Sequence, residues 1–161
     1  MTSKVEIVIK KTERRLLLST LDGIERSYAV ALGKNWAADK AIEGDCATPV
    51  GEFYICAKNP RSKYFLSLCL SYPNAEDARR GLTAGLIGVA EHGQIIDAIR
   101  LGNMPPQHTR LGGEIYIHGR DTARSADKEK DWTRGCIALE NIAMQEVYDR
   151  VSLGTRVSIV A

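Results

Sequence analysis

The stretch DWTRGCIAL, residues 131–139, combines an acidic residue, an indole, a hydroxyl, a cation and a thiol, and then becomes apolar. Its thiol, Cys136, leaves two interpretations open. A cysteine that precedes an apolar run is often a small buried hydrophobe at the start of a strand. A cysteine that follows a glycine can also be a nucleophile, because Gly135 leaves the backbone free to expose N–H groups toward an oxyanion.

A cysteine nucleophile needs a base within hydrogen-bonding reach, and the chain offers three histidines. His92 lies in a helix-like segment and His108 in a Pro-rich loop, whereas His118 ends the strand-like run EIYIHGR, residues 114–120. Strand ends suit functional side chains, because the strand fixes their position and the next loop gives access. His118 is therefore the candidate base, and the alternative is a histidine that merely ends the strand in solvent.

Size and composition limit the possible classes of protein. A chain of 161 residues with 44% hydrophobic and 26% charged residues is typical of one soluble globular domain, 1–161. Its formal net charge is +2, and basic residues alternate with acidic ones, which argues against nucleic-acid binding. No apolar run approaches the roughly 18 residues of a membrane span, and residues 1–11 lack the apolar region of a secretory signal. We expect a monomer.

Periodicity predicts a mainly β domain with a few inserted helices. The Asp22-Gly23 pair predicts a hairpin, Pro60 is expected to separate two strands, and Ile24 is expected to face the core together with Tyr28. The predicted strands lie at 5–9, 14–20, 24–32, 51–57, 64–71, 114–118 and 155–160. The predicted helices lie at 74–80, at 86–101 with interruptions at its glycines, and at 141–151, with Asn74 and Asn141 as caps.

The other three cysteines show no CxxC pair, and a chain of this length needs no disulfide. Cys56 and Cys69 lie in strand-like runs, so we expect buried structural thiols there. Cys46 lies in a polar loop, where its role stays open.

Several motifs together resemble one known family. IHG at 117–119 and TRGC at 133–136, with VALGKN at 30–35 and GDCATPVGEFYI at 44–55, resemble the L,D-transpeptidase catalytic domain family (YkuD, also called ErfK/YbiS). LSYPN at 70–74 and DWTRGCIAL are similar to its YafK-like murein-processing branch. The resemblance covers about residues 4–160, and it implies an L,D-transpeptidase-like β-sandwich or barrel.

The resemblance also implies roles for single residues. Cys136 matches the nucleophile, His118 the general base, and Gly119 the residue whose carbonyl orients that base. Tyr72 matches a position beside the site. The loop that leads into the nucleophile, with N–H groups suited to an oxyanion, is matched by Thr133, Arg134 and Gly135.

The chain departs from the family pattern at two positions. Arg134 stands where many members have a second histidine, and Ala138 stands where many have an arginine near substrate carboxylates. We expect Arg134 or Arg120 to bind those carboxylates instead, because a guanidinium suits bidentate binding. The alternative is that both are solvated loop residues.

The implied chemistry is acyl transfer on peptidoglycan stem peptides through a Cys136 thioester, without a cofactor. The bond before the terminal D-Ala of a tetrapeptide would break, and an amine or water would accept the acyl group. A substrate of this kind implies a place in the cell envelope or periplasm. An amine acceptor would give crosslinks or anchored proteins, and water would make the protein a carboxypeptidase or amidase.

Three rival interpretations remain. One is a cysteine hydrolase that acts on some other amide, and another is a wall-binding module without catalysis. The third is a zinc site, which the sequence disfavours because its ligands lack close paired spacing. Its ligands would be His92, His108, His118 and Cys136.

Overall fold

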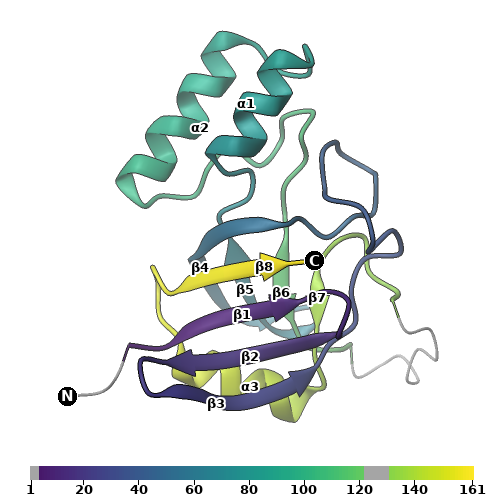
Figure 1. Cartoon of the computed structure of the whole chain (residues 1–161), viewed down its shortest axis with the longest axis vertical. Coiled ribbons are helices and arrows are strands. Elements are labelled where there is room, and N and C mark those ends of the chain that lie inside the picture. Colours follow the sequence, from purple (N-terminus) through teal and green to yellow (C-terminus); the bar gives the residue numbers. More distant parts are fainter. Residues whose placement is uncertain (1–3, 122–130) are drawn as a thin grey trace.

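The computed structural model describes residues 4–121 and 131–161, and a single eight-stranded sheet dominates them (Figure 1). Its strand order is β3-β2-β1-β8-β4-β5-β6-β7. The strands are β1 (Glu6–Lys10), β2 (Arg15–Thr20), β3 (Gly23–Ala29), β4 (Gly51–Ser62), β5 (Phe65–Leu70), β6 (Tyr116–His118), β7 (Ile137–Ala138) and β8 (Arg156–Val160). The helices are α1 (Ala75–Thr83), α2 (Val89–Leu101) and α3 (Asn141–Arg150).

The two ends of this strand order meet. Ala31 lies two residues after β3 and forms an antiparallel bridge with Ala138 of β7. Each of the two N–H groups donates to the other residue's carbonyl at 2.9 Å. The sheet is thereby closed into a barrel-like form, which confirms the predicted fold class of a mainly β domain with inserted helices.

The core lies inside this curved sheet. Alternate residues of β1, Ile7 and Ile9, are fully buried, as the sequence pattern predicts. The same core includes Ile117 of β6, and α3 covers one end of it with Met144 and Val147. The strand that ends at His118 therefore rests on tightly packed apolar side chains.

The helices α1 and α2 pack against each other and project away from the sheet (Figure 1). Asn74 caps α1 as predicted, and Asp77 completes a capping box with it. The predicted segment 86–101 is one helix that begins at Val89, after Gly88 at the cap position. A small apolar cluster around Ile95 joins the two helices, so this hairpin has its own core.

Three local predictions were wrong. Pro60 lies inside β4, at a register shift where the strand needs no N–H donor. Ile24 is 63% exposed, because β3 lies at the end of the strand order and a shift in its pairing with β2 breaks the alternation. Asn141 is not the cap of α3: Glu140 occupies that position, and the Asn141 side chain bonds elsewhere.

Candidate active site

The parallel pair β6–β7 brings the two main candidates together. Ile117 lies opposite Ile137, and His118 lies opposite Ala138. Cys136, one residue before β7, lies beside Tyr116, which donates its N–H to the sulfur at 3.4 Å. Cys136 and His118 both line one cleft of about 960 Å³. One pair of short strands thus places a thiol and an imidazole on the same cavity.

The Cys136 sulfur is held by two main-chain groups. Besides accepting from Tyr116, it donates to the Glu114 carbonyl at 3.4 Å. Burial of the sulfur raises the pKa of Cys136 to about 11, although the Tyr116 N–H and the charge of Lys40 oppose this rise. Within the described residues, no hydrogen bond joins the sulfur to His118. The raised pKa favours the neutral thiol at Cys136.

The His118 imidazole is buried and oriented by its own backbone. Its Nδ1 lies 2.6 Å from the Gly119 carbonyl, an acceptor, so Nδ1 carries the proton and Nε2 is left as the free acceptor. Burial lowers the pKa of His118 below its ordinary 6.5, against the opposing effect of the Gly119 bond. At neutral pH the ring is an uncharged base. The predicted contact between Gly119 and His118 is present.

Two aromatic side chains that the sequence did not single out hold this ring. Tyr64 stacks on the imidazole, with centroids 4.5 Å apart and 22° between the planes. Trp132 meets it at 5.8 Å and 62°, an edge-on contact. Both also line the cleft. The imidazole is thus confined on its face and at its edge.

The turn that carries Cys136 is fixed from both sides. The Thr133 hydroxyl donates to the Cys136 carbonyl at 2.7 Å and accepts from the Gly135 N–H at 3.1 Å. From the other side, the buried Thr48 hydroxyl donates to the Gly135 carbonyl at 2.9 Å and accepts from the Gly33 N–H at 3.0 Å. The N–H groups of Thr133 and Gly135 donate to the Leu32 carbonyl and to the Thr133 hydroxyl, so neither is free for the oxyanion that the family resemblance implies.

Position 135 accepts only glycine. Gly135 has φ +132°, and a Cβ there would lie 2.7 Å from the Ala47 carbonyl oxygen. The backbone of residues 46–48 therefore packs directly on the turn. This contact gives the segment CATP, residues 46–49, a structural role beside the turn.

The predicted substrate-binding residues fall in different places. Arg134 is exposed and lines the cleft. Arg120 lies outside the cleft lining and forms an ion pair with Glu140 at 2.9 Å. Tyr72 is completely buried, and its hydroxyl donates to the Leu111 carbonyl at 2.7 Å. The expectation that Tyr72 flanks the site is corrected: its side chain belongs to the core and stabilises a neighbouring loop.

One lysine acts on the electrostatics of the Cys136 thiol. The pKa of Cys136 is raised overall, and Lys40, rather than Arg134, is the cation whose charge partly opposes that rise. Lys40 is itself buried, forms an ion pair with Asp45 at 3.0 Å, and donates to the Ile42 carbonyl. Among the described residues, three exposed cations of the cleft lining have no ion-pair partner: Arg134, Lys34 and Lys63.

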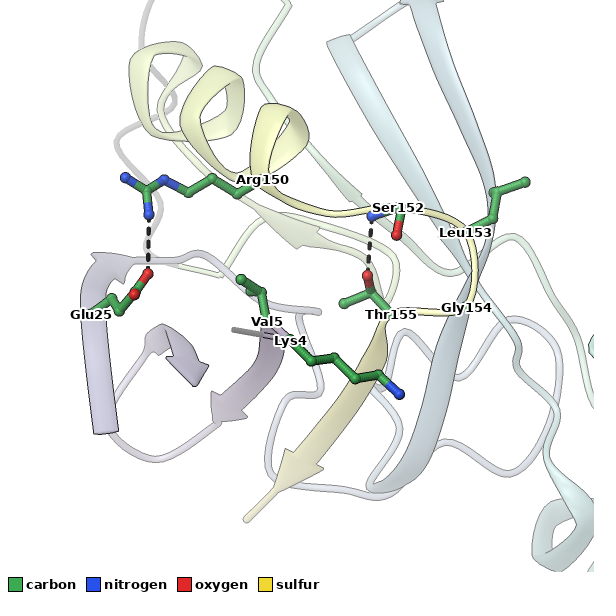
Figure 2. A pocket seen from close by; sticks show the side chains of 8 residues that line it. All are labelled: Lys4, Val5, Glu25, Arg150, Ser152, Leu153, Gly154 and Thr155. Carbon is green, nitrogen blue, oxygen red and sulfur yellow. Dashed lines mark hydrogen bonds and ion pairs between the residues drawn. The ribbon is translucent and has the colours of Figure 1, made fainter. Parts of the chain in front are cut away.

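A second cleft, of about 750 Å³, lies between the start of β1 and the loop after α3 (Figure 2). Glu25 and Arg150 form an ion pair across it at 3.2 Å, and the turn 152–155 forms its opposite wall. Neither a thiol nor an imidazole lines it. Of these two clefts, that of Cys136 is therefore the one lined by both a thiol and an imidazole.

Other proposed sites have no support in the described part of the chain. There, no group of three or more His, Cys, Asp or Glu side chains could hold a metal ion, and His92 lies on α2, outside the Cys136 cleft. All four cysteines are free thiols. No helix within residues 4–121 or 131–161 has the length and apolar character to cross a membrane.

Comparison with known proteins gives one family and a set of similar folds. Residues 4–159 match the family model described as YkuD, L,D-transpeptidase catalytic domain. A comparison with curated proteins gives no match. The helical cell shape determining protein Pgp2 from Campylobacter jejuni is similar, with 26% identity and a TM-score of 0.67 over 98% of this chain and 47% of that chain.

Two further structures have the same fold at lower identity. An L,D-transpeptidase from Mycobacterium smegmatis gives a TM-score of 0.58 and 15% identity over 99% of this chain and 59% of its own. Bd1075 from Bdellovibrio bacteriovorus gives a TM-score of 0.63 and 18% identity over 98% of this chain and 48% of its own. The chain spans about half the length of the solved structures that it matches.

Proposed function

Because the chain belongs to the YkuD L,D-transpeptidase catalytic domain family, we propose that it is a cysteine acyltransferase acting on peptidoglycan stem peptides. One observation carries the proposal. Cys136 and His118 line the same cleft, and the Gly119 carbonyl holds Nδ1 of the imidazole so that Nε2 is the free proton acceptor. A thiol and a neutral, oriented base are the two groups that nucleophilic acyl transfer requires.

The first half of the reaction forms a thioester. The Cys136 hydrogen leaves the Glu114 carbonyl, Nε2 of His118 takes it, and the sulfur attacks the carbonyl carbon that precedes the terminal D-Ala. Backbone N–H groups of the turn before β7 stabilise the oxyanion. The imidazolium then gives its proton to the departing D-Ala amine as the C–N bond breaks. The acyl group is left on sulfur, and His118 is neutral again.

The second half releases the acyl group. An amine acceptor, or water, gives a proton to Nε2 and attacks the thioester carbonyl, and the thiol regains its hydrogen when the C–S bond breaks. An amine acceptor produces a crosslink or an anchored protein, and water produces a shortened stem peptide. The same residues serve both outcomes. A substrate of this kind places the reaction in the cell envelope.

Arg134 is the group proposed to bind a substrate carboxylate. It is exposed, it lines the cleft, and it is two residues from the nucleophile. Ala138, where many family members have an arginine, is buried between its partners His118 and Ala31. The guanidinium of Arg134 offers two parallel donors to a carboxylate.

The test is incubation of the purified protein with a stem tetrapeptide, with and without an isotopically labelled D-amino acid, followed by mass spectrometry. We expect release of D-Ala, a transient acyl adduct on Cys136, and loss of both in Cys136→Ala. Incorporation of the label identifies an amine acceptor, and a tripeptide alone identifies water. Cys46→Ser is the matched control and keeps activity. An inert tetrapeptide with the folded protein, or turnover by Cys136→Ala, would overturn the proposal.

A further inference from the structure

Asn141 does not bond to the helix in which it lies. It is the first residue of α3, and its side-chain oxygen accepts the Arg120 N–H at 2.7 Å. Its amide nitrogen donates back to the Arg120 carbonyl at 3.3 Å. The side chain therefore bonds both main-chain polar groups of one residue in the loop after β6.

This contact lies on the peptide group that orients the proposed base. The Gly119 carbonyl and the Arg120 N–H are the two ends of a single trans peptide. One end accepts from Nδ1 of His118 at 2.6 Å, and the other donates to Asn141 at 2.7 Å. Because a planar peptide turns as one unit, rotation of this group would break both hydrogen bonds.

Neighbouring groups pack closely on the Gly119 end of this peptide. A Cβ on Gly119 would lie 2.4 Å from the Asn141 side-chain oxygen and 2.8 Å from the Tyr64 carbonyl oxygen. Asn141 thus packs on the α-carbon of Gly119 as well as bonding to the next residue. The main chain of Tyr64, whose ring stacks on His118, packs on the same glycine.

We propose that Asn141 is a positioning residue, which holds the Gly119–Arg120 peptide so that its carbonyl fixes the tautomer and strength of the His118 base. The inference deepens the proposed function and rests on it. The hydrogen bonds form a series from the Asn141 oxygen through the peptide to the imidazole, and bonds in series polarise one another. A strong acceptor at one end therefore makes the Gly119 carbonyl a better acceptor at the other.

Two variants of Asn141 are expected to move the base in opposite directions. Asn141→Ala removes the acceptor, so the Gly119 carbonyl binds the imidazolium less well and the pKa of His118 falls. Asn141→Asp keeps an acceptor and makes it anionic, so the pKa of His118 rises. Loss of one such bond lowers kcat of Asn141→Ala about tenfold while KM stays unchanged, since Asn141 lies outside the cleft lining.

The experiment combines NMR titration of the His118 ring with the pH profile of tetrapeptide turnover. The NMR arm needs no substrate, so it judges this inference even where the tetrapeptide proves inert, an outcome that overturns only the proposed function. Glu146→Gln removes a carboxylate of the same helix that bonds Tyr28 rather than the loop after β6, and this control should leave the titration unchanged. Opposite shifts in the two Asn141 variants support the inference. An unchanged His118 titration and tautomer in both, or equal shifts of one sign, would overturn it.

Discussion

The Thr48 hydroxyl donates a 2.9 Å hydrogen bond to the Gly135 carbonyl, across 87 residues of chain. The same oxygen accepts the Gly33 N–H, so one buried hydroxyl joins the segment after β3 to the turn before the nucleophile. Both main-chain groups are shielded from water. The hydroxyl therefore controls the position of Cys136 without contacting the cleft itself.

Thr48→Val should destabilise the protein and displace the nucleophile. Valine fills the same volume but leaves the Gly33 N–H and the Gly135 carbonyl unpaired, which costs about 2–4 kcal/mol of unfolding free energy for two buried groups. Urea unfolding measures this loss, and acylation of Cys136 measures the displacement. Thr48→Ser keeps the hydroxyl and should retain most of both. Equal stability of Thr48→Val and the unaltered protein would contradict the role of the hydroxyl.

The fall of activity at low pH should follow the protonation of His118. Burial holds the pKa of His118 below 6.5, and only the neutral ring can accept the thiol proton. We expect kcat/KM for the tetrapeptide to be constant down to about pH 6.5 and to fall at lower pH with the slope of one proton. Stopped assays across pH 4 to 8 measure this. A limb with its midpoint clearly above 6.5 would argue against a desolvated His118 base.

The pH dependence of alkylation should distinguish a neutral Cys136 thiol beside a neutral His118 imidazole from a preformed thiolate–imidazolium pair. Burial raises the pKa of Cys136 to about 11, so simple alkylation by iodoacetamide should climb steadily with pH toward that value. A thiolate–imidazolium pair would instead give a plateau at neutral pH. His118→Gln should leave the alkaline rise of alkylation in place while abolishing tetrapeptide turnover. A Cys136 thiol that the alkaline solvent has already ionised needs no His118 base to react with iodoacetamide.

The four cysteines should differ in reaction with a carbapenem. Acylation draws on a base and oxyanion donors, which the proposed function assigns to the surroundings of Cys136, so we expect the first adduct there by mass mapping. Cys69 is 2% exposed and its thiol pKa is strongly raised, so it should stay unmodified. Cys46 also lines the cleft, so its rate of reaction with the carbapenem is the comparison that tests Cys136 most directly. A first adduct on Cys46 or Cys69 would contradict the proposed nucleophile.

Arg134→Ala should weaken binding and leave the thiol unchanged. The guanidinium is exposed in the cleft, so its loss should raise KM for the tetrapeptide about tenfold, as expected for one charge-assisted contact. Stability should change by less than about 0.5 kcal/mol. Arg134→Lys should restore part of the affinity, because lysine lacks the bidentate fork. Lys34→Ala is the matched control for a general charge effect, and an equal rise of KM in both variants would refute specific recognition by Arg134.

Sequence patterns could predict seven of the eight strands, because alternation within a strand is a short-range feature, whereas β7 has only two residues and was not predicted. The grouping of Cys136 with His118 was inferred from their local motifs and from the family resemblance. An alternating strand, a histidine at its end and a glycine before a cysteine are all local. The fold class followed from the same periodicity together with the family resemblance. What local patterns could not supply is the set of contacts that orient these two groups.

Those contacts join side chains to distant main-chain groups. Thr48 reaches Gly135, and Asn141 reaches Arg120, whereas threonine and asparagine in isolation are typical turn and cap residues. Asn141 was predicted as a cap because it precedes an apolar helix pattern, but Glu140 adopts the extended cap conformation one residue earlier. Tyr72 was placed beside the site by resemblance, and only packing reveals that its ring is in the core.

The bridge between Ala31 and Ala138 has a consequence for the order of folding. Strand β7 is two residues long, and its neighbours come from β6 on one side and from the N-terminal third of the chain on the other. A contact across so many residues carries a large loop-closure cost, so it forms late compared with the hairpins. The turn that aims Cys136 is therefore completed only when both ends of the domain have met.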